Sequence, residues 1–137
     1  MYEATTQVRV RYGETDQMGY LYYGNYAEYY EVGRAEAIRQ LGFTYRELEE
    51  MGIMMPVAEL NVKYFRPALY DNLITIKTIL KELPTGAKIQ FHSELYNEEN
   101  HLLNVGVTTL VFYDMKEKQK VNMPDALLHR LQPFFNK

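Results

Sequence analysis

Alternating hydrophobic and polar positions recur along the chain and predict five β-strands. The strands cover residues 6–12, 58–66, 72–81, 87–97 and 103–111. Turn-forming residues at Pro84-Thr85-Gly86 and at 97–100 separate the last three strands. Because strands joined by short turns pair in opposite directions, we expect an antiparallel sheet whose last four strands follow one another as a meander.

A helical spacing of hydrophobic positions replaces this alternation in the first third of the chain. We expect a long helix that begins between Tyr23 and Asn25, runs to Leu41 and stops at Gly42. The predicted buried face of this helix carries Tyr26, Tyr30, Gly33, Ala37 and Leu41. Gly33 lowers helix propensity by about 1 kcal/mol relative to alanine. A close approach of the helix to the sheet would explain a glycine at that position.

Two shorter helices complete the predicted elements. Thr44 and Glu47 form a capping-box pattern that begins a helix reaching Met51, and a last helix covers residues 124–131. The order of elements is therefore strand, long helix, short helix, four strands, helix. This order indicates an α+β fold with the long helix packed on the concave face of an antiparallel sheet. The length suits one domain, which we expect to cover residues 1–137.

Composition narrows the class of protein. Hydrophobic residues make up 47% of the chain and charged residues 24%, as in ordinary globular domains. A net charge of −3 argues against a nucleic-acid partner, and no apolar run is long enough to span a membrane. With no cysteine, the chain has no disulfide, no thiolate nucleophile and no cysteine zinc site. The N-terminus does not resemble a signal peptide, and we expect a cytoplasmic protein.

Most familiar catalytic arrangements are missing from the sequence. Ser93 is the only serine and lacks the G-x-S-x-G turn that exposes a nucleophile. The histidines have no metal-ligand spacing, and no glycine-rich phosphate motif is present, so we expect neither a metal site nor nucleotide-driven chemistry. Carboxylate chemistry remains. Asp16 lies in a loop just before the long helix, whose unpaired N–H groups can polarise a carbonyl oxygen. An aspartate before a helix is, however, very commonly just a cap or turn residue.

The segment around Asp16 strongly resembles the hotdog-fold acyl-CoA thioesterases of the 4-hydroxybenzoyl-CoA thioesterase family, close to its YbgC-like members. The most specific part of the resemblance is the loop that runs into a tyrosine-rich helix start. The matching residues are Arg11-Tyr12-Gly13-Glu14-Thr15-Asp16-Gln17-Met18-Gly19, Asn25-Tyr26, Glu31-x-x-Arg34, Leu41-Gly42, Gly52-Ile53, Pro56-Val57, Tyr64-x-Arg66-Pro67-Ala68 and Tyr70-Asp71.

The resemblance implies a hotdog fold and a catalytic site. Asp16 matches the catalytic aspartate of the family, which acts on the thioester carbonyl as a nucleophile or as a general base. Tyr23 matches the helix-start residue whose N–H binds the thioester oxygen, with Gly24 beside it. Many members of the family have histidine where this chain has Tyr23, but any residue except proline supplies the N–H.

The resemblance also implies a substrate and an assembly. The substrate would be a small-molecule acyl-CoA, with water as the second reactant and no cofactor. Candidate substrate-binding residues are Tyr26, Arg66, Lys63 and Lys88, the basic ones because coenzyme A carries phosphates. Subunits of the family pair edge to edge with sites at the interface, which predicts a homodimer or a homotetramer. An acyl-carrier-protein thioesterase and a non-catalytic acyl-binding module remain alternatives.

Overall fold

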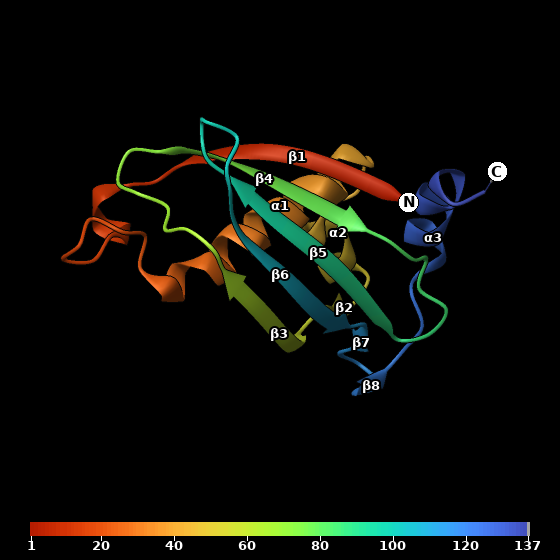
Figure 1. Cartoon of the computed structure of the whole chain (residues 1–137). Coiled ribbons are helices and arrows are strands. Elements are labelled where there is room, and N and C mark those ends of the chain that lie inside the picture. Colours follow the sequence, from red (N-terminus) through yellow and green to blue (C-terminus); the bar gives the residue numbers. More distant parts are fainter. Residues whose placement is uncertain (137) are drawn as a thin grey trace.

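The computed structural model describes residues 1–136 and contains one large antiparallel sheet (Figure 1). Its five strands lie in the order β1-β4-β5-β6-β3. They comprise β1 (Tyr2–Arg9), β4 (Leu73–Leu80), β5 (Lys88–Tyr96), β6 (Leu102–Val111) and β3 (Val57–Tyr64). A second sheet of short strands consists of β2 (Ile53–Met54), β7 (Tyr113–Asp114) and β8 (Gln119–Lys120).

The helices confirm the sequence prediction closely. A 3-10 turn, η2 (Tyr23–Asn25), leads directly into the long helix α1 (Tyr26–Gln40), which packs on one face of the large sheet (Figure 1). Thr44 accepts a hydrogen bond from the Glu47 N–H at 3.1 Å and caps the next helix as predicted. The remaining helices are α2 (Tyr45–Glu50), α3 (Asp125–Leu131) and the 3-10 turns η1 (Tyr12–Glu14) and η3 (Gln132–Phe134). No helix within residues 1–136 is both long and apolar enough to cross a membrane.

The predicted meander of four strands is wrong for β3. Strands β4, β5 and β6 follow one another as expected, but β3 pairs with β6 and not with β4. In this pairing, Val57 lies opposite Leu110 at one end of β3, and Tyr64 lies opposite Asn104 at the other end. This places β3 at a free edge, because no other strand of residues 1–136 pairs with its outer side.

The first strand begins and ends earlier than its hydrophobic pattern predicts. It pairs with β4 from Tyr2 opposite Leu80 to Arg9 opposite Leu73. Tyr12, the last residue of the predicted strand, belongs instead to the turn η1 and is 78% exposed. The Thr15 N–H donates to the Tyr12 carbonyl at 3.1 Å and closes that turn. The chain thus leaves the sheet before the tyrosine.

Two glycines allow α1 to lie very close to the sheet. A Cβ atom at Gly33 would sit 2.5 Å from the Thr78 hydroxyl oxygen and 2.6 Å from a methyl carbon of Ile76. On the sheet side, a Cβ at Gly106 would meet the ring of Tyr30 at 2.3 Å. The Tyr30 hydroxyl, from the helix, donates a hydrogen bond to Oδ1 of Asn104 on β6 at 2.5 Å. The close approach expected from Gly33 is therefore present.

Replacing Gly33 with alanine should destabilise the protein despite the better helix propensity of alanine. The new methyl group collides with β4, and overpacking of this kind costs about 1–3 kcal/mol, which exceeds the gain of about 1 kcal/mol in propensity. Urea unfolding should show a lower free energy of unfolding for Gly33→Ala. Gly86→Ala is the matched control, because nothing lies within 4 Å of its added Cβ. Equal stability of the two variants would contradict the close contact.

Candidate active site

Asp16 is the first residue of a tight turn and has one carboxylate oxygen to spare. The turn is closed by the Gly19 N–H, which donates to the Asp16 carbonyl at 3.0 Å. Oδ1 of Asp16 accepts the N–H of Met18 at 2.9 Å and that of Tyr20 at 3.2 Å. Oδ2 accepts no hydrogen bond from residues 1–136. One oxygen therefore fixes the turn, and the other is free for chemistry.

The helix start offers two free N–H groups. The Asn25 N–H donates to the Tyr22 carbonyl, and the Tyr26 N–H donates to the Tyr23 carbonyl. The N–H groups of Tyr23 and Gly24 come before these and have no acceptor within residues 1–136. Unpaired N–H groups at a helix start carry partial positive charge and can stabilise a negative oxygen atom.

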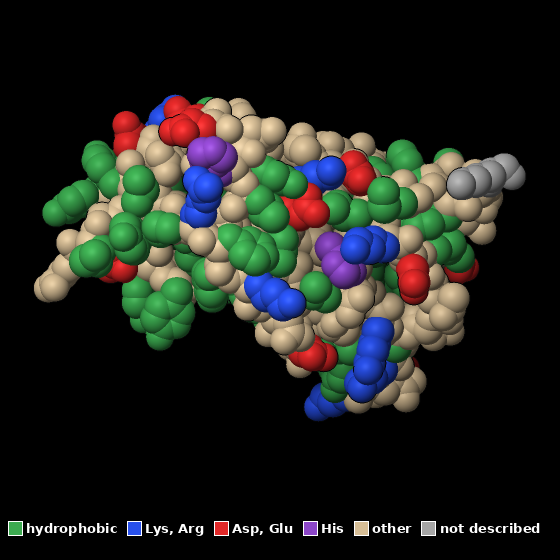
Figure 2. Space-filling view, in the orientation of Figure 1, with side chains coloured by type: hydrophobic (Ala, Val, Ile, Leu, Met, Phe, Trp, Pro, Cys, Tyr) green, Lys and Arg blue, Asp and Glu red, His purple; other side chains and the backbone are tan. Residues whose placement is uncertain are grey.

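A cavity of about 290 Å³ brings the Asp16 turn and the helix start together. The residues that line it are Asp16, Tyr20, Leu21, Tyr23, Tyr26, Tyr64, Phe65, Arg66 and Pro67. Figure 2 shows exposed hydrophobic side chains gathered at the end of the molecule that holds this loop. The residues that line the cavity therefore carry a carboxylate, the free N–H group of Tyr23 and aromatic rings, a combination that suits a polar reaction on a substrate with an apolar part.

Tyr26 and Arg66 are both in this cavity. The Tyr26 side chain is buried, and its hydroxyl accepts the Ala68 N–H at 3.2 Å. Burial raises the pKa of the Tyr26 hydroxyl, so this group stays neutral. Its ring packs edge-on against Tyr64, with 5.3 Å between the ring centroids. The Arg66 guanidinium lies 3.0 Å from the His101 ring nitrogen Nδ1 and is exposed.

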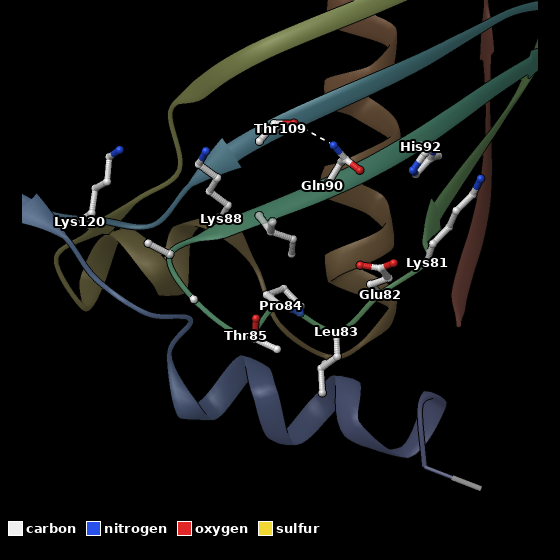
Figure 3. Close-up of a pocket in the computed structure, with 13 residues that line it drawn as sticks. Lys81, Glu82, Leu83, Pro84, Thr85, Lys88, Gln90, His92, Thr109 and Lys120 are labelled. Carbon is white, nitrogen blue, oxygen red and sulfur yellow. Dashed lines mark hydrogen bonds between the residues drawn. The ribbon is translucent and has the colours of Figure 1, made fainter.

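Lys63 and Lys88 do not line the Asp16 cavity. Lys63 is exposed on β3, opposite Val105 of β6. Lys88 is the first residue of β5 and belongs to a different cavity of about 600 Å³ (Figure 3). Asn104 of β6 pairs with Tyr64 of β3 on one side and with Leu95 of β5 on the other, so Leu95 marks the level of the Asp16 cavity along β5. Seven residues of strand separate Leu95 from Lys88, a distance of roughly 23 Å.

The second cavity is basic. Lys81, Lys88 and Lys120 line it together with His92, and Glu82 is its only acidic residue (Figure 3). None of the three lysines forms an ion pair with another residue of 1–136. Burial, and after it the charge of Lys81, lowers the pKa of His92. This surplus of positive charge in an acidic chain suits an anionic ligand.

Glu14 is the principal residue of the site that the sequence interpretation missed. Its side chain is only 12% exposed. Oε1 accepts the Arg11 N–H at 2.9 Å and the Tyr29 hydroxyl at 2.8 Å, and Oε2 accepts from the Arg11 guanidinium at 3.3 Å. Burial by itself raises the pKa of Glu14, but these three hydrogen bonds outweigh it and lower the pKa. The three-residue spacing of Arg11 and Glu14 was the available signal.

Comparison with known proteins identifies the family. The model of the thioesterase-like superfamily matches residues 10–131, and the chain belongs to this family. Membership confirms the resemblance stated from the sequence and agrees with the hotdog arrangement of one long helix on an antiparallel sheet.

Individual relatives carry thioesterase names. The chain is 35% identical over 102 residues to the putative acyl-CoA thioesterase YneP of Bacillus subtilis, covering 74% of this chain and 73% of the relative. It is 29% identical over 121 residues to the acyl-CoA thioester hydrolase YbgC of Escherichia coli, covering 88% and 90%. The crystal structure of a DHNA-CoA thioesterase from Staphylococcus aureus superimposes with a TM-score of 0.87 at 30% identity, covering 100% of this chain and 97% of the other.

The lowered pKa of Glu14 predicts a pH-dependent contribution to stability. A carboxyl whose pKa is lower in the folded state stabilises the fold above its ordinary value of 4.5, and this stabilisation is lost as the pH falls through the lowered value. Glu14→Gln should therefore be less stable than the wild type at pH 7, and the difference in free energy of unfolding should shrink as the pH falls below 4.5 and through the lowered pKa. Urea unfolding of both proteins at a series of pH values from 7 downward measures this difference in free energy of unfolding. A gap that does not change with pH would contradict the ionised, hydrogen-bonded carboxylate.

Proposed function

We propose that this chain hydrolyses acyl-CoA thioesters through Asp16 and the helix start. The supporting observation is that Asp16, whose Oδ2 is free, and Tyr23, whose N–H is unpaired, line the same cavity, and Gly24 with its unpaired N–H directly follows Tyr23. The family and the relatives identify the chain as a thioester hydrolase of the acyl-CoA type. The roles of the individual residues are the proposal.

The reaction needs a nucleophile at the thioester carbonyl carbon and a partner for its oxygen. Oδ2 of Asp16 either attacks that carbon, giving an acyl anhydride that water then hydrolyses, or removes a proton from the attacking water. In both routes the carbonyl oxygen gains negative charge, which the N–H groups of Tyr23 and Gly24 stabilise. The C–S bond then breaks, and coenzyme A leaves as a thiolate that takes up a proton. The products are the free acid and coenzyme A.

Asp16→Asn should lower kcat by at least about a hundredfold, the scale of general acid–base catalysis, while the fold persists. Asparagine keeps an oxygen that can accept the turn N–H groups. Thiol release from acyl-CoA, followed with a chromogenic thiol reagent, measures the loss. Asp114→Asn is the control, because Oδ1 of Asp114 accepts the N–H groups of Lys116 and Glu117 in a similar turn outside the cavity. Near-normal turnover of Asp16→Asn would refute the assignment.

We further propose that two copies pair through β3. Every residue of β3 except Val62 is exposed, including the apolar Val57 and Leu60. An unpaired strand with apolar side chains invites another strand. In an antiparallel pair of identical strands, the two-fold axis passes through a residue that faces its own copy. An axis at Asn61 would place Glu59 of each copy opposite the lysine at position 63 of the other copy. The two resulting pairs of opposite charges would favour this cross-strand register.

This pairing would bring the basic cavity near the catalytic cavity of the other copy. Phe65, which lines the Asp16 cavity, would then lie opposite the second copy's position 57. Val57 is at the end of the sheet where β6 reaches Leu110 and β5 begins. Lys88 is two strands away, or about 10 Å across the sheet. We therefore propose that Lys81, Lys88 and Lys120 bind the phosphates of a coenzyme A whose thioester lies in the other copy.

Lys88→Ala should raise KM for acyl-CoA about tenfold or more, since a hydrogen bond to a charged group contributes about 1.5–3 kcal/mol, and should leave kcat nearly unchanged. The same acyl group on N-acetylcysteamine, which has no phosphates, should show no change in KM. Lys77→Ala is the control, because Lys77 already pairs with Glu3 at 3.6 Å. An equal rise in KM for both thioesters would contradict phosphate binding.

A further inference from the structure

Glu14 joins the two halves of the candidate active site although it does not line the cavity. Its carboxylate reaches forward to Tyr29, one turn inside α1, at 2.8 Å. Its backbone carbonyl accepts the Tyr22 N–H at 2.9 Å and the Asn25 side-chain amide at 2.9 Å. The residue that precedes Asp16 by two positions is therefore bound both to the segment before the helix and to the helix itself.

The contacts on the other side of Glu14 fix the Asp16 turn. The Arg11 N–H and guanidinium hold the Glu14 carboxylate from the strand side. Directly after Glu14, residue Thr15 bridges to Leu21, and the Asp16 N–H donates to the Tyr20 carbonyl at 2.8 Å. Glu14 is thus the point where the turn that carries Asp16 is tied to the helix start that carries the free N–H groups.

We propose that Glu14 is a positioning residue for the hydrolysis, which sets the place of the Asp16 carboxylate relative to the N–H groups of Tyr23 and Gly24. The proposal rests on the proposed function. Its physical basis is that both catalytic elements are surface segments, with Asp16 exposed and Tyr23 68% exposed. Asp16 and Tyr23 themselves lie outside the hydrophobic core, although Leu21 and Tyr26 on either side of Tyr23 belong to it. A displacement of about 1 Å between reacting groups can cost about a hundredfold in rate.

The chemistry of the two hydrogen-bond donors explains why an ionised carboxylate suits this position. Tyr29 is 2% exposed, so its hydroxyl needs an acceptor inside the protein, and Glu14 supplies it. Hydrogen bonds to an ionised acceptor are about twice as strong as neutral ones. A charged acceptor with two oxygens can bind the helix through one donor and the strand through others at the same time. A neutral side chain holds the same groups less firmly.

The experiment compares Glu14→Ala, Glu14→Gln and Tyr29→Phe with the wild type. Glu14→Ala removes every side-chain contact and should lower kcat about 10- to 100-fold, with KM changed less than about threefold, because binding surfaces of the cavity stay intact. Glu14→Gln keeps an oxygen for the Tyr29 hydroxyl and should restore most of kcat. Tyr29→Phe should give an intermediate loss, and its effect should be much smaller in the Glu14→Ala background, since both changes break the same link.

The matched control is Glu36→Gln. Glu36 pairs with Arg39 three residues away on α1, just as Glu14 pairs with Arg11 three residues away, but it has no contact with the site. Its kcat should equal that of the wild type. All rates are measured at least 15 °C below the thermal midpoint of each variant, so that loss of folded protein does not contribute.

Amide hydrogen exchange gives a readout that does not depend on catalysis. In Glu14→Ala, or in Glu14→Gln to a smaller extent, the amides of Asp16, Tyr22 and Asn25 should exchange faster, while those of β5 remain protected. A kcat of Glu14→Ala within twofold of the wild type, or unchanged exchange at these amides, would overturn the positioning role. If Asp16→Asn is inactive in the same assay, the loss of the positioning role would leave the proposed function standing. A wild-type protein that releases no thiol would overturn both.

Discussion

The close contact between α1 and the sheet is the constraint on which the rest of the structure depends. Gly33 on the helix and Gly106 on β6 have no side chain at two points where a Cβ atom would collide with the other layer. The Tyr30 hydroxyl and Asn104 then lock the helix in one place along the sheet. Because α1 cannot slide or tilt without a collision, its first turn is held at one end of the sheet, beside Tyr64 at the end of β3.

The large sheet has a different cavity at each of its two ends, and the two cavities differ in the side chains that line them. At one end, the Asp16 turn, the first turn of the helix and the aromatic end of β3 surround a small cavity. At the other end, lysines from three separate segments surround a larger basic cavity. A single subunit keeps these features about 23 Å apart along the strands. A thioester with an apolar acyl group at one end and phosphates at the other has the same division of chemistry.

The sequence predicted elements whose pattern is local and missed those that depend on distant partners. The glycine at position 33 and the cap at Thr44 are local signals, and both predictions are confirmed. The neighbour of β3 is β6, whose paired residues lie 40 to 53 positions further along the chain, and alternation alone could not show this pairing. The position of Asp16 before a helix and the family resemblance both point to this residue. Glu14 was missed because its contact with Tyr29 forms only when the loop folds back on α1.

The pairing proposed for the free edge of β3 would link the amount of protein to its stability. An isolated subunit leaves the backbone groups on the outer side of this strand and side chains such as Val57 in water. Any process that buries the edge against a second copy stabilises the folded state by mass action. Dilution would then weaken the fold and, by separating the copies, remove one wall of the substrate site. For such a chain the concentration of subunits is itself a variable of enzyme function, alongside temperature and pH.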